Sequence, residues 1–386
     1  MYTYIFNAIN PNLRTHDTHI TQKLLNLISG IEHVRYDICK NHCVCYAGYP
    51  NARACPICNT PRHQPNGKPW DTFDYLPITH RIKLFMSHPS YAKKFHQYPY
   101  KLWKSRQPGI LRDIWDGKLC DYLRHTRLLD HKRGDLGFFF STDGVKLFSR
   151  GYFAVWPLIL VNYNLPPSER FKEENLIIFG VIPGPKQPND MNSYLRPLIN
   201  EFKILEKGIK VWDAILSAQR ILHAYILVVG GDQPAREKLM GMMGQNSNSH
   251  CCYCLIKGVH NKHTYCPFRT PEDHDQVGVD EPVGPFNFHP QALPLRTDTQ
   301  HRRDAYHIVR TGDAEYQRQI GIKELSIFTE LRSIVFPWSF SIDIMHLFYE
   351  NVVKKMYDHW RGKFFTAEKT EQAGTRSEKF KVLLIS

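Results

Sequence analysis

Apolar positions along the chain follow two different patterns. Short runs of strand length, LGFFFSTDG, YFAVWPLILVNY and NLIIFGVIPG, come after Gly134 and predict three consecutive strands of an antiparallel meander. Residues 190–205 have apolar positions at helical spacing, and the continuous apolar run AYILVVGGD after them predicts a buried central strand. The order of three strands, helix and strand predicts a mixed α/β fold whose mixed sheet is flanked by helices.

Helical spacing also marks the segments on either side of these strands. It predicts a helix after Asp17, a helical region interrupted by Pro89, Pro99 and Pro108, a helix over 233–243 and a long final helix over 341–361. The patterns divide the chain into an N-terminal helical segment (1–35), a Cys-rich module (36–66), a basic aromatic helical region (67–134), the α/β core (135–262), an inserted loop and helix (263–320), a core-completing helical segment (321–364) and a polar tail (365–386).

The positive charge of the protein is concentrated in one part of the sequence. The whole chain carries a formal net charge of +13, and residues 79–133 hold thirteen Lys or Arg against four Asp, with aromatic residues between them. This composition favours a polyanionic partner and predicts a surface that holds the phosphate backbone of DNA. A solvated helical layer over an aromatic core is the alternative. The DNA-binding candidates are Arg81, Lys83, Lys93, Lys94, Lys101, Lys104 and Arg106.

The sequence gives no sign of a membrane or secretory protein. Its longest nearly apolar run, Tyr152 to Val161, falls far short of the roughly 20 residues that a spanning helix needs. The start MYTYIFNAINPNLR lacks the features of a secretory signal, so we expect a reducing compartment. Clustered cysteines in such a compartment indicate metal ligands rather than disulfides.

Two cysteine groups have the spacing of metal ligands. Cys39-x3-Cys43 with Cys55-x2-Cys58 predicts a closed, structural Zn2+ site, because zinc prefers four ligands and thiolate is a favoured donor. Free structural cysteines are the alternative for this group. The second group, Cys251-x2-Cys254, is half a site, and its partners would come from the neighbouring residues; buried core cysteines are its alternative. The substitute or partner ligands considered are Cys45, His42 and His63 for the first group, and His250, His260, His263 and Cys266 for the second.

Acidic residues follow two of the predicted strands. Asp143 and Asp232 each come directly after an apolar run, and their oxygens suit Mg2+ or Mn2+. Turn aspartates are the alternative. In the final helix Asp343, His346 and Glu350 have the i, i+3, i+7 spacing of one helix face, which would add a third acid; a solvated polar face is the alternative.

Five segments, in this order, resemble transposases of CACTA (En/Spm-type) DNA transposons of the fungal and plant type. They are YDICKNHCVCYAGYPNARACPIC, STDGVKLF, WPLILVNYNLPPSERFKEENLIIFGVIPGPKQPNDMNSYLRPLINE, GGDQPAREKLMGMMG with the following CxxC, and FPWSFSIDIMHLFYENVV. The resemblance covers roughly Tyr36 to Trp360. It implies an RNase H-like core of the DDE/D type.

The resemblance also implies roles for individual residues. Asp143 and Asp232 would be the first and second catalytic carboxylates, Cys251 with Cys254 the family's cysteine pair, and Asp343 with His346 its DxxH pair. The family's third acid is expected farther along than this helix, and the sequence extends 36 residues beyond Glu350. Glu350 is the candidate third acid, and a truncated copy is the expectation.

The function expected from these features is DNA binding with metal-dependent strand cleavage and transfer in the nucleus. The expected cofactors are structural Zn2+ and catalytic Mg2+ or Mn2+. Transposon DNA ends are the expected partner, together with a second copy of the chain or a second transposon-encoded protein. A catalytically dead or domesticated zinc-containing DNA-binding protein is one alternative, and a protein-interaction scaffold is another.

Overall fold

The protein is described here from a computed structural model, which describes residues 30, 32–130, 132–146, 154–184, 188–244, 247–261, 263–265 and 293–361. The helix predicted after Asp17, the polar tail predicted over 365–386 and most of the predicted inserted loop lie outside these residues. Within the described part of the chain, each helix is too short or too polar to cross a bilayer.

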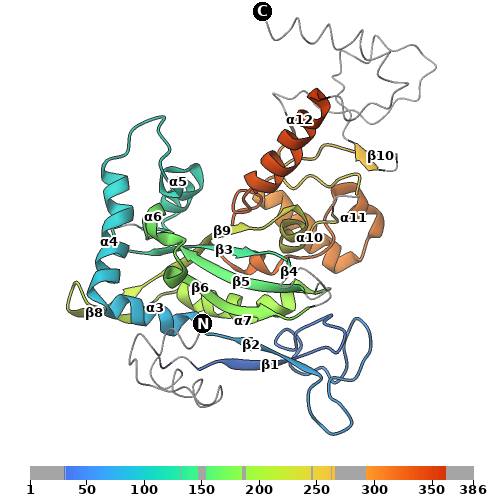
Figure 1. Ribbon diagram of the computed structural model, residues 1–386, viewed down its shortest axis with the longest axis horizontal. Helices are drawn as coiled ribbons and strands as arrows, with labels where there is room; N and C mark the ends of the chain where they lie inside the picture. Colours follow the sequence, from blue (N-terminus) through green and yellow to red (C-terminus); the bar gives the residue numbers. More distant parts are fainter. Residues whose placement is uncertain are drawn as a thin grey trace, which may run out of the picture.

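A mixed sheet forms the centre of the molecule (Figure 1). Its strands are β3 (Leu136–Thr142), β5 (Ala154–Asn162), β6 (Leu176–Ile182) and β9 (Ala224–Gly230), with the short β4 (Val145–Lys146) pairing with the start of β5. The spatial order is β6, β5, β3, β9; the first three are antiparallel neighbours and β9 runs parallel to β3. The predicted meander and the predicted mixed sheet are therefore confirmed.

One face of the sheet is covered by α7 (Met191–Leu205). Asp190 begins this helix by accepting the backbone N–H of Ser193, as an N-cap residue does. The apolar side of α7 enters the main core, where Phe202 packs edge-on against Phe138 of β3 with 6.0 Å between ring centroids. The predicted helix over 190–205 is confirmed.

A second apolar cluster covers the opposite face of β9. It is formed by η1 (Ile114–Asp116) and α5 (Lys118–His125), whose buried side chains pack with Tyr225 and Leu227. All seven residues of β9 are consequently buried, because both faces of this strand are covered. This explains the continuous apolar run. The predicted burial is confirmed, but the predicted central position is wrong, because β9 lies at the end of the strand order, beside β3.

The basic region is helical, but one predicted break is wrong. α3 (Ile78–Ser87) ends just before α4 (Pro89–Lys104), and α4 continues through Pro99. A proline inside a helix leaves the carbonyl four residues earlier without its usual donor. Here that carbonyl belongs to Phe95, and the side-chain amide of Asn164 donates to it at 3.1 Å. A tertiary contact therefore replaces the hydrogen bond that Pro99 cannot make.

The Cys-rich module is a loop between two paired strands, β1 (Val34–Ile38) and β2 (Asp71–Tyr75). β2 lies beside β6, and the next residue, Leu76, donates its backbone N–H to Phe179 of that strand. The remaining elements are α6 (Pro167–Arg170), η2 (Glu173–Asn175), the hairpin β7 (Ile209–Asp213) and β8 (Ala218–Leu222), α8 (Gln233–Met240), β10 (Val259–Asn261), β11 (His263–Tyr265), α10 (Asp298–Thr311), α11 (Ala314–Ile320) and η4 (Ile327–Glu330).

The final helix starts later than predicted and has a different first half. Residues 339–341 run parallel to β9, where Val229 donates to Ser339 at 2.7 Å and accepts from Ser341 at 3.0 Å. A π-helix, η5 (Met345–Val353), follows and continues as α12 (Lys354–Trp360). The prediction of a helix from residue 341 was wrong at its start, because pairing with the free edge of β9 holds this segment extended.

Candidate functional site

The first candidate site is the cluster of Cys39, Cys43, Cys55 and Cys58. The four sulfur atoms lie within 4.8 Å of one another, and Cys39 Sγ is 3.4 Å from Cys58 Sγ. Ligands about 2.3 Å from a tetrahedral zinc ion are about 3.8 Å apart, so the cluster can hold such an ion. Among the residues that the structure describes, this is the one group of three or more His, Cys, Asp or Glu with ligand atoms so close together.

The environment of the cluster distinguishes its thiols. Burial raises the pKa of Cys39, and burial raises the pKa of Cys43 to about 12. At Cys58 burial acts in the same direction, but hydrogen bonds with Thr60 and Asn41 outweigh it and lower the pKa to about 5. The cluster therefore already stabilises one thiolate, the form in which cysteine binds a metal.

The Cys-rich module is joined to the start of α7 by several hydrogen bonds. Asp190 donates its backbone N–H to the carbonyl of Cys43 at 3.0 Å, and its carboxylate accepts from Tyr49 Oη at 2.8 Å. The backbone N–H of Cys45 donates to Ser193 Oγ at 2.9 Å. His42 donates from Nδ1 to the carbonyl of Pro183 just after β6, at 2.8 Å. The cysteine site and the central sheet are thus parts of one packed unit.

The second candidate site lies where β3 and β9 end. Asp143 follows the last residue of β3, and Asp232 comes two residues after β9. Since these strands are parallel neighbours, both aspartates lie at the same edge of the sheet. Gly231 keeps the two ends close, because a Cβ there would stand 2.8 Å from the carbonyl oxygen of Thr142.

Electrostatic interactions connect Asp143 to the other predicted site residues. The pKa of Asp143 is raised above its ordinary value, first by burial and then by the negative charge of Asp232. His346 acts on it in the opposite direction, and Asp343 raises it further. The acidic residues that follow β3 and β9 are therefore close enough to interact electrostatically with the residues at the start of η5.

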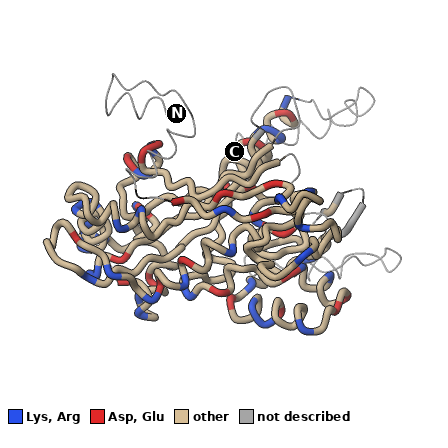
Figure 2. The backbone as a smooth tube through the Cα atoms, turned by 90° about the horizontal axis from the view of Figure 1, so that it is seen from below, with Lys and Arg blue, Asp and Glu red and all other residues tan. Residues whose placement is uncertain are grey.

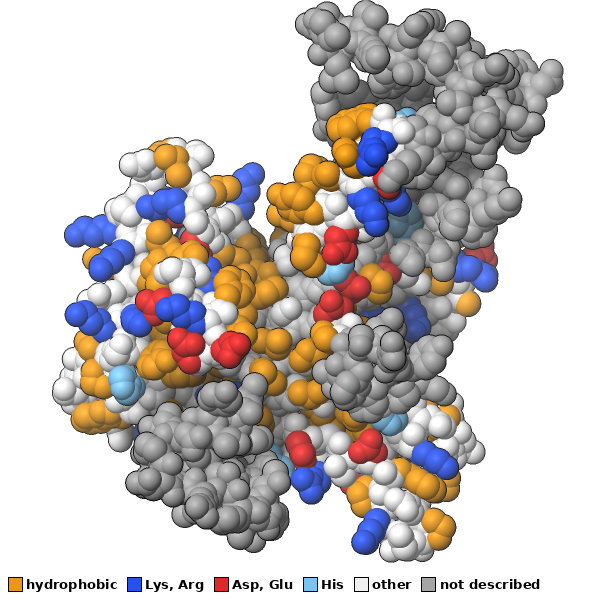
Figure 3. Space-filling model, viewed as in Figure 1, with side chains coloured by type: hydrophobic (Ala, Val, Ile, Leu, Met, Phe, Trp, Pro, Cys, Tyr) orange, Lys and Arg blue, Asp and Glu red, His pale blue; other side chains and the backbone are white. Residues whose placement is uncertain are grey.

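Three polar side chains line one side of the start of η5. Asp343 accepts the backbone N–H groups of Met345 and His346 at 2.9 and 3.2 Å, and it accepts from His346 Nδ1 at 2.6 Å. The hydrogen bond to Asp343 raises the pKa of His346. The other ring nitrogen, Nε2, lies 4.0 Å from Glu350 Oε2. Acidic side chains and a histidine gather at the base of the final helix, beside a hollow in the surface (Figure 3).

The acids do not form a ligand group as compact as the cysteine cluster. Asp232 accepts the backbone N–H of Ala235 at 2.8 Å and caps α8, and Asp343 caps its own helix. Each of these carboxylates is directed partly toward backbone donors. Carboxylate oxygens are nevertheless the donors that Mg2+ and Mn2+ prefer, so the residue types fit such ions.

The basic candidates divide into two groups by their contacts. Arg81 donates to the carbonyl of Ile178, Lys94 pairs with Glu169 at 2.6 Å, and Arg106 makes two hydrogen bonds to Asp121 at 2.5 and 2.6 Å. These three cations stabilise the fold through internal contacts. The second group consists of the exposed lysines Lys83, Lys93, Lys101 and Lys104.

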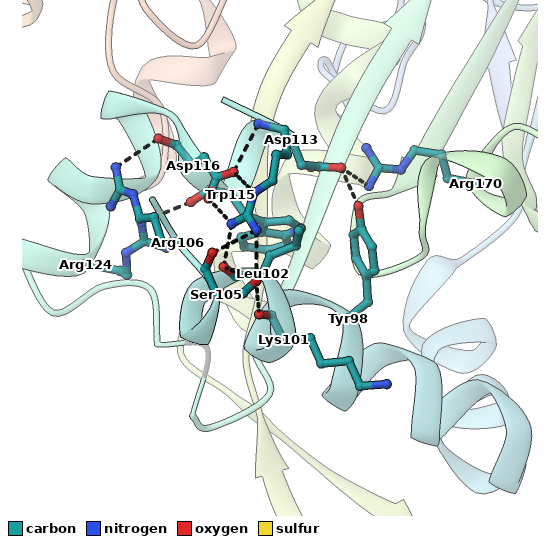
Figure 4. Close-up of polar contacts among 11 residues, drawn as sticks. Tyr98, Lys101, Leu102, Ser105, Arg106, Asp113, Trp115, Asp116, Arg124 and Arg170 are labelled. Carbon is teal, nitrogen blue, oxygen red and sulfur yellow. Dashed lines mark hydrogen bonds and ion pairs between the residues drawn. The ribbon is translucent and has the colours of Figure 1, made fainter. Parts of the chain in front are cut away.

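Figure 4 shows how arginines and aspartates hold the helical region together. Arg106 also donates to the backbone carbonyl of Asp116 at 2.9 Å, and Arg170 pairs with the buried Asp113 at 2.7 Å. Tyr98 of α4 donates to the same Asp113 carboxylate at 2.8 Å. Lys and Arg positions are correspondingly interspersed with Asp and Glu along the backbone (Figure 2). Much of the positive charge that predicted a DNA surface is therefore paired with acidic side chains of the protein itself.

The exposed lysines of α4 form a ridge. Lys93, Lys101 and Lys104 are spaced so that they share one face of the helix. We call these three residues the α4 lysine ridge. Tyr100 and Trp103, which are 41% and 37% exposed, lie on or beside this face. Figure 3 shows basic side chains gathered over α4.

The Cys251–Cys254 pair is close together in the structure. The two sulfur atoms are 3.2 Å apart, and Cys251 Sγ accepts the backbone N–H groups of Tyr253 and Cys254 at 3.4 Å each. The hydrogen bond with Cys254 lowers the pKa of Cys251 to about 5. Cys266 lies outside the described residues, so its predicted role as a partner stays a prediction.

Sequence analysis did not single out Lys238. Its ammonium lies 5.3 Å from the ring centroid of Trp156, and the charge of Asp232 acts on it. Lys238 follows Asp232 by six residues on α8, but no motif marks it. Only the contact of Lys238 with Trp156 of β5 and its interaction with Asp232 reveal its position near the acids.

Residues 115–267 match the model of the transposase family tnp2. No curated protein matches the chain. The matched segment begins at η1, passes through the central sheet and includes Asp143, Asp232 and the Cys251–Cys254 pair. This match supports a transposase family for the chain.

Proposed function

We propose that this chain is a CACTA-type, transposase-derived protein that binds DNA and cleaves it by a metal-dependent DDE/D mechanism on an RNase H-like core. The observation that carries the proposal is the parallel pairing of β3 with β9, which puts Asp143 and Asp232 at one edge of the sheet. The extended segment 339–341 on the other side of β9 supports it further, because this segment leads directly to Asp343.

Each acid has a distinct part in the proposed mechanism. When bound, two Mg2+ or Mn2+ ions would supply activation of water or a 3′-hydroxyl and stabilisation of the leaving oxygen during in-line attack on a DNA phosphodiester. Asp143 and Asp232 would supply carboxylate ligands. Asp343 holds His346 in place through its 2.6 Å contact with Nδ1, and Glu350, next to the other ring nitrogen, is the proposed third acid.

The α4 lysine ridge is the proposed DNA-holding surface. Lysines bind the phosphate backbone without sequence preference and with strong salt dependence. The exposed rings of Tyr100 and Trp103 are suited to stack on unpaired or distorted bases. Zn2+ at the cysteine cluster would be structural, because four thiolates leave no open position for a substrate. We expect the protein to act in the nucleus, on transposon ends, as a homo-oligomer or with a second transposon-encoded chain.

A catalytically inactive DNA-binding protein is the second candidate. It is favoured by the structural hydrogen bonds of Asp232 and Asp343 and by the absence, among the described residues, of a compact ligand group containing these acids. This candidate keeps the cysteine cluster and the lysine ridge and loses only the chemistry. A protein-interaction scaffold would need neither the catalytic chemistry nor the DNA-binding surface.

A nicking assay on supercoiled plasmid in Mg2+ or Mn2+ separates these candidates. The expected result is metal-dependent nicking by the full chain that Asp143→Asn and Asp232→Asn abolish. Asp313→Asn is the matched control, because Asp313 caps α11 as Asp232 caps α8 and asparagine also caps helices well. Absence of nicking with intact DNA binding would favour the inactive protein, and absence of both would favour the scaffold.

A further inference from the structure

A cavity of about 200 Å³ is lined in part by Lys238, the residue on which the charge of Asp232 acts. Its walls come from the start of α7, the end of α8 and the segment that follows α11. Met191 and Met242 provide apolar surface, and Lys238, Lys323 and Glu324 provide charged groups. Apart from Lys238, none of these residues takes part in the sites described above.

The chain is built so that Lys323 lies close to α8. Gly241 ends this helix with a φ of 72°, and a Cβ there would stand 2.3 Å from the carbonyl oxygen of Glu324. Only glycine permits both the left-handed conformation and this close approach. The carbonyl of Gly241 in turn accepts the backbone N–H groups of Lys323 and Glu324 at 2.7 and 3.1 Å.

The cavity has more positive than negative groups. Burial lowers the pKa of Lys238, and the positive charge of Lys323 lowers it further, so the two ammonium groups are close enough to repel each other. Glu324 is the one acid on the lining, and burial raises its pKa. The nearby Asp190 carboxylate is already bonded to Tyr49 and to the start of α7. Two like charges held together in this way favour an anionic ligand.

Contacts connect the cavity to the catalytic edge of the sheet. The ammonium of Lys238 lies over the ring of Trp156. The same ring would be 3.2 Å from a Cβ on Gly144, the neighbour of Asp143. Asp232 also acts electrostatically on Lys238. Lys238 therefore connects the cavity to the acids, and a DNA strand bound at Asp143 and Asp232 would pass close to it.

We infer that this cavity binds a backbone phosphate of the DNA strand next to the phosphate that is cleaved. Lys238 and Lys323 would hold the phosphate oxygens, and Met191 with Met242 would contact the deoxyribose. This inference rests on the proposed function. The inference extends the proposed function by assigning a second phosphate-binding position, which would fix the DNA strand relative to the acids.

The test compares full-length Lys238→Gln/Lys323→Gln with the wild type by fluorescence anisotropy on a labelled duplex over a range of salt concentrations. Loss of one phosphate contact should lower the slope of log K against log salt by about 0.9. Affinity at low salt should fall about tenfold. Lys207→Gln/Lys210→Gln is the matched control, since it removes the same charge from exposed lysines of the α7–β7 region. The variant Lys238→Arg/Lys323→Arg should keep the wild-type slope.

The possible outcomes separate this inference from the proposed function. If the wild type binds DNA and the Lys238→Gln/Lys323→Gln variant keeps the slope of its control, the cavity assignment is wrong and the proposed function stands. If the wild type does not bind DNA, both are wrong. Stabilisation of the wild type by inorganic phosphate, with an unchanged DNA slope in the variant, would mean an anion site unrelated to DNA and would also overturn the inference.

Discussion

Replacing the three residues of the α4 lysine ridge with glutamine tests the proposed role of this surface in DNA binding. Lys93, Lys101 and Lys104 are exposed on one face of α4, and the glutamine variant keeps most of the length and helix propensity of each side chain. The substitution therefore removes charge from the surface without removing packing from the core. We expect the variant to fold as the wild type does and to bind DNA more weakly.

The size of the effect follows from the number of phosphate contacts. Each contact contributes about 0.9 to the slope of log K against log salt, so three lysines contribute about 2.7. Over a change from about 50 to about 200 mM salt, this difference corresponds to roughly a 40-fold change in the affinity ratio of wild type to variant. The defect should be large at low salt and nearly vanish at high salt.

Fluorescence anisotropy titrations at several salt concentrations measure this slope directly. The control is Lys172→Gln/Lys207→Gln/Lys210→Gln, which removes the same charge from exposed lysines outside α4. Equal slopes for the ridge variant and this control would refute a specific role for α4. In that case the change in DNA binding would follow from net charge alone, wherever the lysines lie.

The remaining predictions concern the two candidate sites and the internal ion pairs. Cys55→Ser should abolish stoichiometric zinc and lower the thermal unfolding midpoint, and a variant that keeps both would contradict the metal site. Because the folded-state pKa of Asp143 is raised, its contribution to stability is complete below the unfolded pKa and is lost as pH rises through the folded pKa. The free energy of unfolding of Asp143→Asn, measured by urea titration, should therefore exceed that of the wild type by a few tenths of a kcal/mol at pH 7. In acid, where the wild-type carboxyl is also neutral, the two should be equal. Gly231→Ala should cost about 1–3 kcal/mol and reduce any nicking, because its Cβ would separate the ends of β3 and β9; unchanged stability would disprove the close approach. Arg106→Gln should destabilise by about 1 kcal/mol through loss of the Asp121 pair while leaving the DNA salt slope unchanged, and a lowered slope would return Arg106 to the DNA surface.

Long apolar patterns predicted the core elements of the fold correctly. β9 is apolar throughout because α7 and the α5 cluster cover its two faces, and the sequence pattern of α7 reflects one buried side. The hairpin of β7 and β8 was not predicted. Its strands are short, and Trp212 and Ile221 are about half exposed, so burial does not produce a clear alternation of apolar residues.

The start of the final helix could not be predicted from local sequence. Residues 339–341 are extended because Val229 of β9 pairs with them, a contact between positions more than a hundred residues apart. The π-helical turn that follows leaves no periodic signal that distinguishes it from an α-helix. Tertiary pairing, rather than residue preference, decides the conformation here.

The candidate site was predictable to the extent that strand order determines it. Asp143 and Asp232 could be placed together because the first and fourth strands of the predicted order can be neighbours, and β3 and β9 are. The sequence could not show which basic residues pair internally and which are exposed, since this depends on partners distant in sequence. Arg170, for example, meets Asp113 across 57 positions. Composition counts charges but does not show which of them are paired.

Through the hydrogen bonds between the Cys-rich module and α7, an ion held by the four cysteines would affect more of the structure than its own site. Cys43 belongs to the cluster that can hold a metal ion, and its backbone carbonyl is also the acceptor for Asp190, which begins the helix that covers the sheet. Losing the ion would release this turn and with it the first turn of α7. With zinc as that ion, its supply during synthesis would determine how many chains fold with α7 in place and with Asp143 and Asp232 at one edge of the sheet.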